Sequence, residues 1–378
     1  MKLAVCLYKY FPFGGLARDF LRIMTICRQR GYDIDVYVME WQGDIPEGFN
    51  VHIIPLQGWS NHRKVASFVQ QIQAKLEHGN YDLIVGFNKI PGLDLYYAAD
   101  PCYIDRVKNQ KDYFLQQYLG RVRFYSKGEA SVFSEQSATV ALMISDIQMA
   151  LFKKHYHTPD NRLLMLPPGI SADRKRPDNW QQIRHDFRDE FSIADDDFIV
   201  LMVGTGFKTK GLDRGIEALA SLPAAALNKA HLFVVGDGDT APYQKRADKL
   251  SIAEHVHFFG GRTDVPRFLL GADVLIHPAR KENTGTVILE AIVAGLPVLV
   301  TEVCGYAKHV TKSQTGGVSN SPFKQVDFNT QLMSMLDKNY LQTRSVNGLS
   351  YAESEDLYSM PTQVADIIDE MTHAKIEP

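Results

Sequence analysis

Two glutamates, Glu282 and Glu290, stand eight positions apart where an expected strand is followed by an expected helix. The apolar run at 273–277 predicts the strand, and the helix is expected to run toward Gly295. Open α/β sheets bind ligands just beyond the carboxyl ends of their strands. Each of two carboxylates at that place can accept hydrogen bonds from a pair of neighbouring hydroxyls. Together they indicate a sugar donor that carries both a ribose and a hexose. The alternative is a solvated helix face, because the macrodipole alone favours Glu near a helix N-terminus.

A glycine pair follows the first expected strand of the chain, at residues 3–7. Gly14 and Gly15 open an expected helix, whose free N–H groups favour an anion such as a diphosphate. The spacing is not the G-x-G-x-x-G of a dinucleotide site, and a plain tight turn is the alternative. Asp19 lies one turn into this helix and points either toward the ligand or toward water.

A second glycine-rich loop, residues 204–211, contains Lys208 and Lys210. Lysines near the carboxyl end of a strand can neutralise the charge that grows on a leaving diphosphate. The alternative is a pair of solvated surface lysines. Arg174, just after a Pro-Pro-Gly sequence, is a further candidate for the same phosphates.

Both halves of the 378-residue chain alternate short apolar runs with helical patterns. This alternation predicts two doubly wound α/β domains with parallel sheets, facing one another across a cleft. The expected domains are 1–170 and 171–354, with a helix at 355–378 packing back on the first. Strands are expected at 3–7, 34–38, 51–55, 82–87, 139–144 and 163–170, and then at 198–203, 231–235, 256–259, 273–277 and 297–300.

Composition places the chain among ordinary globular proteins. The hydrophobic content is 45%, and the formal net charge of -3 argues against bulk nucleic-acid binding. Four scattered cysteines show no metal-ligand spacing, which indicates buried thiols in a reducing compartment and no structural metal. No apolar run is long enough to span a bilayer. We therefore expect a cytoplasmic protein whose membrane contact, if it has any, is peripheral.

The segment 103–127 interleaves aromatic and basic residues. This composition suits the interface of an anionic bilayer. It also suits single-stranded nucleic acid, or a helix pair whose aromatics are core. The residues assigned to the membrane patch are Tyr103, Arg106, Lys108, Lys111, Arg121, Arg123 and Lys127.

Several longer motifs carry a family resemblance over nearly the whole chain. They are residues 6–16 (CLYKYFPFGGL), 86–89 (GFNK), 91–94 (PGLD), 166–170 (LPPGI), 215–223 (GIEALASLP) and 303–307 (VCGYA). With them the chain resembles the retaining GT-B sugar transferases of glycosyltransferase family 4. Within that family it is most similar to the enzymes that add glucose to an inner-core heptose of lipopolysaccharide.

The resemblance implies separate jobs for the candidate residues. Glu282 approaches the donor hexose, Glu290 holds the ribose, Lys210 binds phosphate, and Gly15 lies beneath the diphosphate. The backbone around Arg262 faces the uracil, and no metal or other cofactor is required. The full donor-binding set is Gly14, Gly15, Arg174, Lys208, Lys210, Arg262, Glu282, Asn283, Thr284, Gly285, Thr286, Val287 and Glu290.

The chain departs from the family pattern at two kinds of position. Thr205 and Thr209 stand where arginines are usual, so Lys208 is the candidate for the second positive charge. Asn283 and Thr284 replace smaller residues beside the sugar, so the donor is glucose first and another UDP-hexose second.

We therefore expect a UDP-sugar-dependent, retaining transferase that acts on a lipopolysaccharide core at the anionic inner face of the inner membrane, without nucleic acid as a partner. Lys210, Glu282 and Asp19 are the catalytic candidates, and Asp19 and Asp100 are the candidates for a general base. A UDP-sugar epimerase of the same fold is one alternative. A peripheral membrane-binding protein with a degenerate sugar site is the other.

Overall fold

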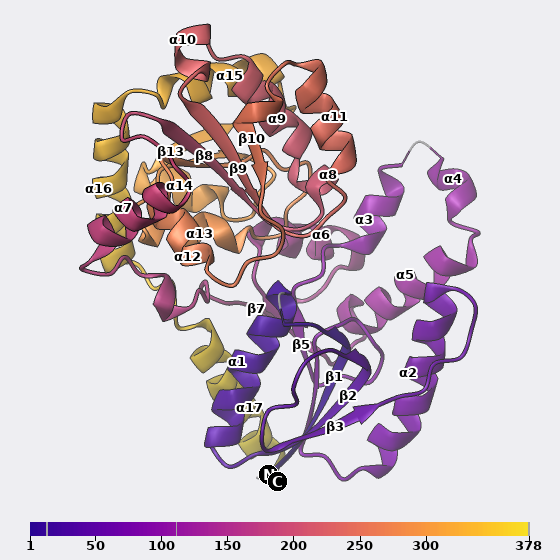
Figure 1. The fold of residues 1–378 in the computed structure, drawn as a ribbon. Coiled ribbons are helices and arrows are strands. Elements are labelled where there is room, and N and C mark those ends of the chain that lie inside the picture. Colours follow the sequence, from indigo (N-terminus) through magenta and orange to yellow (C-terminus); the bar gives the residue numbers. More distant parts are fainter. Residues whose placement is uncertain (13, 111, 377–378) are drawn as a thin grey trace. The chain divides into compact units, whose positions relative to one another are not determined.

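The computed structural model describes residues 1–12, 14–110 and 112–376. The chain divides into two compact units, Met1–Gly169 with Tyr358–Pro378, and Ile170–Leu357. Each unit is a parallel sheet with helices packed on it (Figure 1).

Unit 1 contains a seven-stranded sheet in the order β3-β2-β1-β4-β5-β6-β7, in which every pair of neighbours is parallel. The apolar centre of β1 is buried because it lies between β2 and β4, with helices on both faces. The strands are β1 (Lys2–Tyr10), β2 (Asp33–Trp41), β3 (Phe49–Ile53), β4 (Leu83–Gly86), β5 (Leu95–Ala98), β6 (Val140–Met143) and β7 (Leu163–Met165).

The helices of unit 1 include the last one of the chain. They are α1 (Gly15–Gln29), α2 (Asn61–His78), α3 (Tyr103–Lys108), α4 (Tyr113–Gln116), α5 (Gly120–Phe133), α6 (Asp146–Tyr156) and α17 (Met360–Ile376). Helix α17 packs against α1, since Val364 and Ile368 share a core with Phe20. Arg30, the C-cap residue of α1, adds ion pairs of 2.6 Å to Asp366 and Asp369.

Unit 2 contains a six-stranded parallel sheet in the order β10-β9-β8-β11-β12-β13. Its strands are β8 (Phe198–Val203), β9 (Ala230–Val235), β10 (Val256–Phe258), β11 (Val274–His277), β12 (Val298–Thr301) and β13 (Gly316–Ser319). Its helices are α7 (Trp180–Glu190), α8 (Phe207–Lys210), α9 (Leu212–Ala220), α10 (Ala224–Leu227), α11 (Ala241–Lys249), α12 (Val265–Gly271), α13 (Thr286–Val293), α14 (Ala307–Ser313), α15 (Gln325–Ser334) and α16 (Lys338–Ser354).

The sequence patterns predict eleven of these strands and miss β5 and β13. Strand β5 has only four residues, and its two adjacent tyrosines give no alternation to detect. Strand β13 begins with two glycines, which have low strand propensity, and pairing with β12 stabilises it instead. Ser145 caps the start of α6, where its side chain accepts a hydrogen bond from the backbone N–H of Gln148.

In the described parts of the chain, no helix combines the length and the apolar character that crossing a bilayer demands.

Candidate functional site

The candidate site lies where β8 and β11, neighbours in the sheet of unit 2, end side by side. The glycine-rich loop 204–211, which includes the short helix α8, follows β8, and the loop 278–285 follows β11. Gly211 lies where the two loops approach each other closely. It adopts a φ of +76°, and a Cβ on it would lie 2.1 Å from the carbonyl oxygen of Pro278. Only glycine permits this approach, which brings Lys210 to the loop that carries Glu282.

A second left-handed glycine ends the 278–285 loop. Gly285 has a φ of +87° and is the N-cap of α13. The loop is also attached to a neighbouring segment, since Glu282 forms an isolated parallel bridge with Cys304. The carbonyl of Thr284 accepts a hydrogen bond of 2.8 Å from the backbone of Tyr306. The predicted glutamate therefore lies on a loop fixed at both ends.

Two side chains contact the same carboxylate oxygen of Glu282. Its Oε2 forms an ion pair with Lys210 Nζ and lies 2.9 Å from Nε2 of His277. The side chains of Glu282 and Lys210 are 12% and 23% exposed. Burial acts to raise the pKa of Glu282, but the hydrogen bond from His277 and the charge of Lys210 outweigh it and lower that pKa to about 2. Glu282 is therefore a carboxylate at any physiological pH.

His277, the last residue of β11, was not assigned a role from the sequence. Its side chain is 1% exposed, and Nε2 contacts Glu282. Its Nδ1 is buried and has no hydrogen-bond partner among the described residues. The structure thus uses His277 as a support for Glu282. A histidine at the carboxyl end of a buried strand, five residues before the candidate glutamate, is the signal that points to it.

Two arginines that the sequence analysis also missed join the two loops. Arg280 binds Asp213 through two bonds of 2.7 Å, and its Nη1 donates to the carbonyl of Lys208 at 3.1 Å. The backbone N–H of Arg280 donates to the carbonyl of Thr209 at 2.8 Å. Arg214 donates to the carbonyls of Pro278 and Ala279 at 3.1 Å each. Together they fix the backbone on which Lys210 and Glu282 stand.

Glu290 lies on α13 and is 5% exposed. Its Oε1 lies 3.6 Å from Nε of Arg174, whose side chain is 13% exposed. The structure therefore places Arg174 beside the glutamate that the resemblance assigns to the ribose. The contact of Arg174 with the phosphates of the sugar donor remains a prediction.

The other predicted donor-binding residues of unit 2 occupy different surroundings. Lys208 is exposed on α8. Arg262 binds Asp264 through two bonds of 2.8 Å, so its guanidinium is engaged and only its backbone is available for the predicted base contact. Of the loop residues, Asn283, Thr284, Thr286 and Val287 are partly exposed and Gly285 is buried.

The predicted residues of unit 1 lie at the carboxyl ends of β1 and β5. Gly14 is the N-cap of α1, and a Cβ on Gly15 would meet no atom within 4 Å. Asp19 accepts a hydrogen bond of 2.9 Å from Tyr97, and Asp100 accepts one of 3.2 Å from Asn88. These bonds fix both carboxylates, and their part in catalysis remains a prediction.

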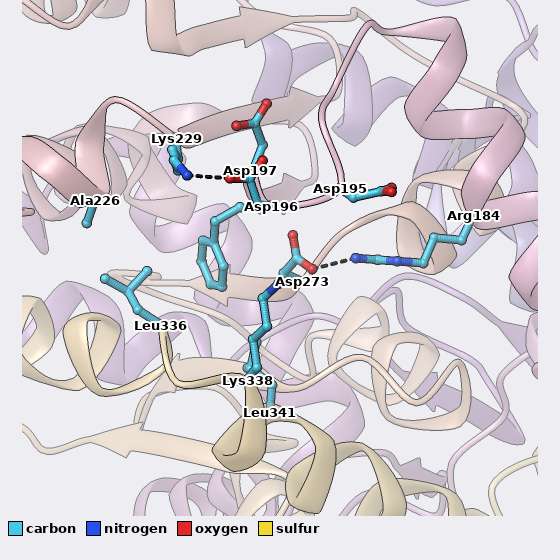
Figure 2. Close-up of a pocket in the computed structure, with 11 residues that line it drawn as sticks. Arg184, Asp195, Asp196, Asp197, Ala226, Lys229, Asp273, Leu336, Lys338 and Leu341 are labelled. Atoms are coloured by element: carbon cyan, nitrogen blue, oxygen red, sulfur yellow. Dashed lines mark hydrogen bonds and ion pairs between the residues drawn. The ribbon is translucent and has the colours of Figure 1, made fainter.

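A cavity of about 390 Å³ lies at the opposite edge of the unit 2 sheet, where β8, β9 and β11 begin (Figure 2). Four of its charged side chains form two pairs: Arg184 binds Asp273 at 2.6 Å, and Lys229 binds Asp196. Ligands of such sheets bind at the carboxyl ends of the strands, so this cavity is separate from the candidate site. In residues 1–12, 14–110 and 112–376, no group of three or more His, Cys, Asp or Glu side chains has a geometry that could hold a metal ion.

The chain is similar to several known proteins. A family model described as "Glycosyl transferases group 1" matches residues 183–348. Lipopolysaccharide glucosyltransferase WaaG of Escherichia coli (strain K12) is 43% identical over 369 residues, which cover 97% of this chain and 98% of that protein. The chain belongs to the group 1 glycosyltransferases. The predicted family and enzyme class are confirmed.

Solved structures agree with this membership. The crystal structure of WaaG matches this glycosyltransferase with a TM-score of 0.93 at 42% identity, covering 97% of this chain and 99% of that one. The predicted GT-B fold is therefore confirmed. Anabaena Alr3699/HepE in complex with UDP and glucose matches with a TM-score of 0.74, 98% of this chain and 100% of that one being covered. At 17% identity this second likeness shows the fold alone.

Proposed function

We propose that this glycosyltransferase moves a hexose, with glucose as the first choice, from a UDP-sugar to an inner-core heptose of lipopolysaccharide, retaining the anomeric configuration. The observation that carries the proposal is the 43% identity to a lipopolysaccharide glucosyltransferase over almost the whole of both chains. The charged pair of Lys210 and Glu282 at the ends of β8 and β11 supports it, because that is where an α/β sheet binds a ligand.

In the proposed reaction, the bond from the hexose C1 to the diphosphate oxygen breaks. A bond from C1 to an acceptor hydroxyl oxygen forms on the same face, and the leaving diphosphate takes the acceptor proton. Lys210, the N-terminus of α1 at Gly14 and Gly15, and Arg174 supply positive charge to the diphosphate, and the reaction uses no metal ion. Glu282 accepts hydrogen bonds from the hexose and Glu290 from the ribose.

The contacts of Lys210 give this proposal a specific consequence. Lys210 forms an ion pair with Glu282. A diphosphate that binds Lys210 therefore replaces Glu282 as the anionic partner of the lysine. His277 continues to donate to Glu282 and keeps that partly buried carboxylate hydrogen-bonded. The donor sugar then binds a carboxylate that is already ionised and oriented.

The test is a panel of UDP-sugars incubated with core-truncated lipopolysaccharide, with the mass of the product as the measurement. We expect addition of one hexose, most rapidly from UDP-glucose. If no donor adds a hexose, the proposal is wrong. If a UDP-sugar changes its configuration at C2 without any acceptor, the epimerase alternative takes its place.

We also propose that the acceptor is met at an anionic membrane surface, on the cytoplasmic face of the inner membrane. Arg106, Lys108, Arg121, Arg123 and Lys127 of the assigned patch are exposed, Tyr103 is partly buried, and Lys111 lies outside the described residues.

The tip of this segment adds apolar side chains to the charge. Phe114, Leu115 and Tyr118 are 73%, 70% and 70% exposed, and none of the four residues of α4 is buried. Phe124, in contrast, packs on the core of unit 1. The segment therefore divides into a supported base and an exposed apolar tip that basic residues flank in the sequence, as suits an interfacial anchor.

Charge reversal tests this anchor. R121E/R123E is expected to weaken binding to anionic vesicles and leave the weak binding to neutral ones unchanged, because the patch acts through charge. Lys154, exposed on α6, supplies the matched control K154E. Equal binding of R121E/R123E and the parent protein to anionic vesicles would remove the membrane proposal and leave sugar transfer standing.

A further inference from the structure

Trp59 is 97% exposed, on the loop between β3 and α2. The two other tryptophans have partners: Trp41 stacks on Tyr10 at 3.9 Å between ring centroids, and Trp180 lies 3.5 Å from the guanidinium of Arg176. The strand and loop that lead to Trp59 expose further apolar surface, since Ile53 is 55% exposed and Leu56 is 36% exposed. A large aromatic side chain left in water beside other apolar groups indicates a surface that is covered in use.

This loop is next to the proposed membrane segment, although about sixty residues separate them in sequence. Trp59 precedes α2 by two residues, and His62 in the first turn of α2 lies close to Gly120, the first residue of α5. A Cβ on Gly120 would be 3.8 Å from Nε2 of His62. Figure 1 likewise shows the first turn of α2 beside the start of α5. The exposed tryptophan therefore lies near the base of the α4–α5 tip.

The two segments carry the same sign of charge. Residues 48–76 contain three basic residues, Arg63, Lys64 and Lys75, and no acid. Residues 113–128 also contain three basic residues and no acid, in a chain whose formal net charge is -3. Arg63 and Lys64 are exposed in the first turn of α2, directly after Trp59. Positive charge is thus concentrated where the two helices begin.

The helix termini add to this field. Helix α2 has 18 residues and α5 has 14, and among the described residues neither has a side chain that caps its N-terminus. The positive ends of both helix dipoles therefore lie at this place, and their first N–H groups are not covered by a capping side chain.

We propose that Trp59, with Arg63 and Lys64, forms a second anchor for an anionic phospholipid bilayer, on one docking surface with the α4–α5 tip. The inference rests on the membrane part of the proposed function and adds a segment distant in sequence. Tryptophan suits the headgroup level because its ring is apolar and its indole N–H finds a polar partner there. The adjacent cations and helix N-termini match the phosphates of the lipids. Two anchors fix the orientation of unit 1 on the surface, which one anchor alone does not.

Tryptophan emission tests the proposal directly. With the full-length protein and vesicles of phosphatidylglycerol and phosphatidylcholine, we expect a blue shift and quenching by brominated acyl chains. W59F is expected to abolish both changes, whereas W180F, which alters the tryptophan of unit 2, is expected to retain them. Vesicles of phosphatidylcholine alone are expected to give no shift.

The charges of Arg63 and Lys64 are tested by a variant and a matched control. R63Q/K64Q is expected to lower the vesicle partition coefficient on the order of 30-fold, from roughly 1 kcal/mol for each cation at the surface. K75Q removes an exposed lysine from the last turn of the same helix, roughly 17 Å away along the axis, and is expected to leave the coefficient unchanged.

Three outcomes would overturn the inference. One is a shift that survives in W59F. Another is vesicle binding by the parent protein without any change in Trp59 emission, which leaves the α4–α5 anchor standing. The last is a shift produced by soluble core oligosaccharide and not by vesicles, which makes Trp59 a sugar platform. Hexose transfer to a detergent-solubilised acceptor is measured in parallel and is expected to be unchanged in W59F, so that failure of the sugar-transfer proposal is recognised separately.

Discussion

Each unit contains a lysine–glutamate pair, and the two pairs differ in burial and in how many bonds the glutamate makes. In unit 1, Glu129 is fully buried and lies 2.5 Å from Lys89. Its carboxylate also accepts hydrogen bonds from the backbone of Tyr103 and Ile104 at 2.7 and 3.0 Å, and from the Tyr156 hydroxyl at 2.9 Å. These bonds occupy both oxygens and fix the start of α3.

In unit 2, both strong partners of Glu282 contact Oε2. The other oxygen, Oε1, accepts a bond of 3.2 Å from the backbone of its own neighbour Asn283. Lys210 is 23% exposed, against 9% for Lys89. The comparison shows that residue type alone does not distinguish a structural ion pair from a candidate binding site. The unused hydrogen-bonding capacity does, because a ligand can bind only to atoms that are not already saturated.

The largest expected effect comes from breaking the pair in unit 1. E129A leaves Lys89 charged in a buried site and removes the acceptor of two backbone N–H groups. We expect a loss of about 3–5 kcal/mol in the free energy of unfolding, measured by urea denaturation. E135A, an exposed glutamate two residues beyond α5, is the control and is expected to change little. A similarly small loss in E129A would remove the distinction between the two pairs.

Breaking the pair in unit 2 is expected to affect activity instead. E282A is expected to lower kcat/KM for the UDP-sugar by about 100-fold, equivalent to roughly 2.7 kcal/mol of lost transition-state stabilisation. Its unfolding free energy is expected to fall by less than that of E129A, because Lys210 reaches solvent, although the contacts with Lys210, His277 and the Asn283 backbone are all lost. K281A changes the exposed neighbour and serves as the control. Unchanged kinetics in E282A would make Glu282 a structural residue like Glu129.

A smaller effect is expected from the support of Glu282. H277Q keeps an N–H hydrogen-bond donor on a side chain that extends less far toward Glu282, and H277A removes the donor. We expect about a 10-fold loss in kcat/KM for H277A, mostly through KM for the donor, with partial recovery in H277Q, because a net hydrogen bond to a charged group contributes about 1.5 kcal/mol. Equal losses in both variants, with kcat alone affected, would contradict a positioning role.

The smallest expected effect is a pH dependence of stability. The pKa of Glu282 is about 2, below its ordinary value of 4.5. Its stabilising contribution is therefore fully present above about pH 4.5 and is lost as the pH falls toward 2. Urea midpoints of the parent protein are expected to fall more steeply than those of E282Q between pH 5 and pH 3. Parallel curves would mean that Glu282 is not held as an ionised group.

The sequence predicts most of the fold because its local signals agree with the final structure. Apolar runs such as 198–203 and 273–277 become strands since they are long enough to be buried on both faces. Strands β5 and β13 escape prediction because pairing with neighbours, and not their own residues, makes them strands. The glycines around Lys210 and the spacing of Glu282 and Glu290 likewise locate the candidate site at a sheet edge before any coordinates are known.

What the sequence determined by itself is therefore the family, the two parallel sheets and the loops on which the candidate residues stand. The tertiary structure decided which side chains meet. It placed His277 behind Glu282, joined the two loops through Arg280 and Gly211, set Arg174 against Glu290, and brought the first turn of α2 beside the start of α5. These contacts join residues from separate strands and helices, and a local pattern has no means of recording a distance between two segments that only folding brings together.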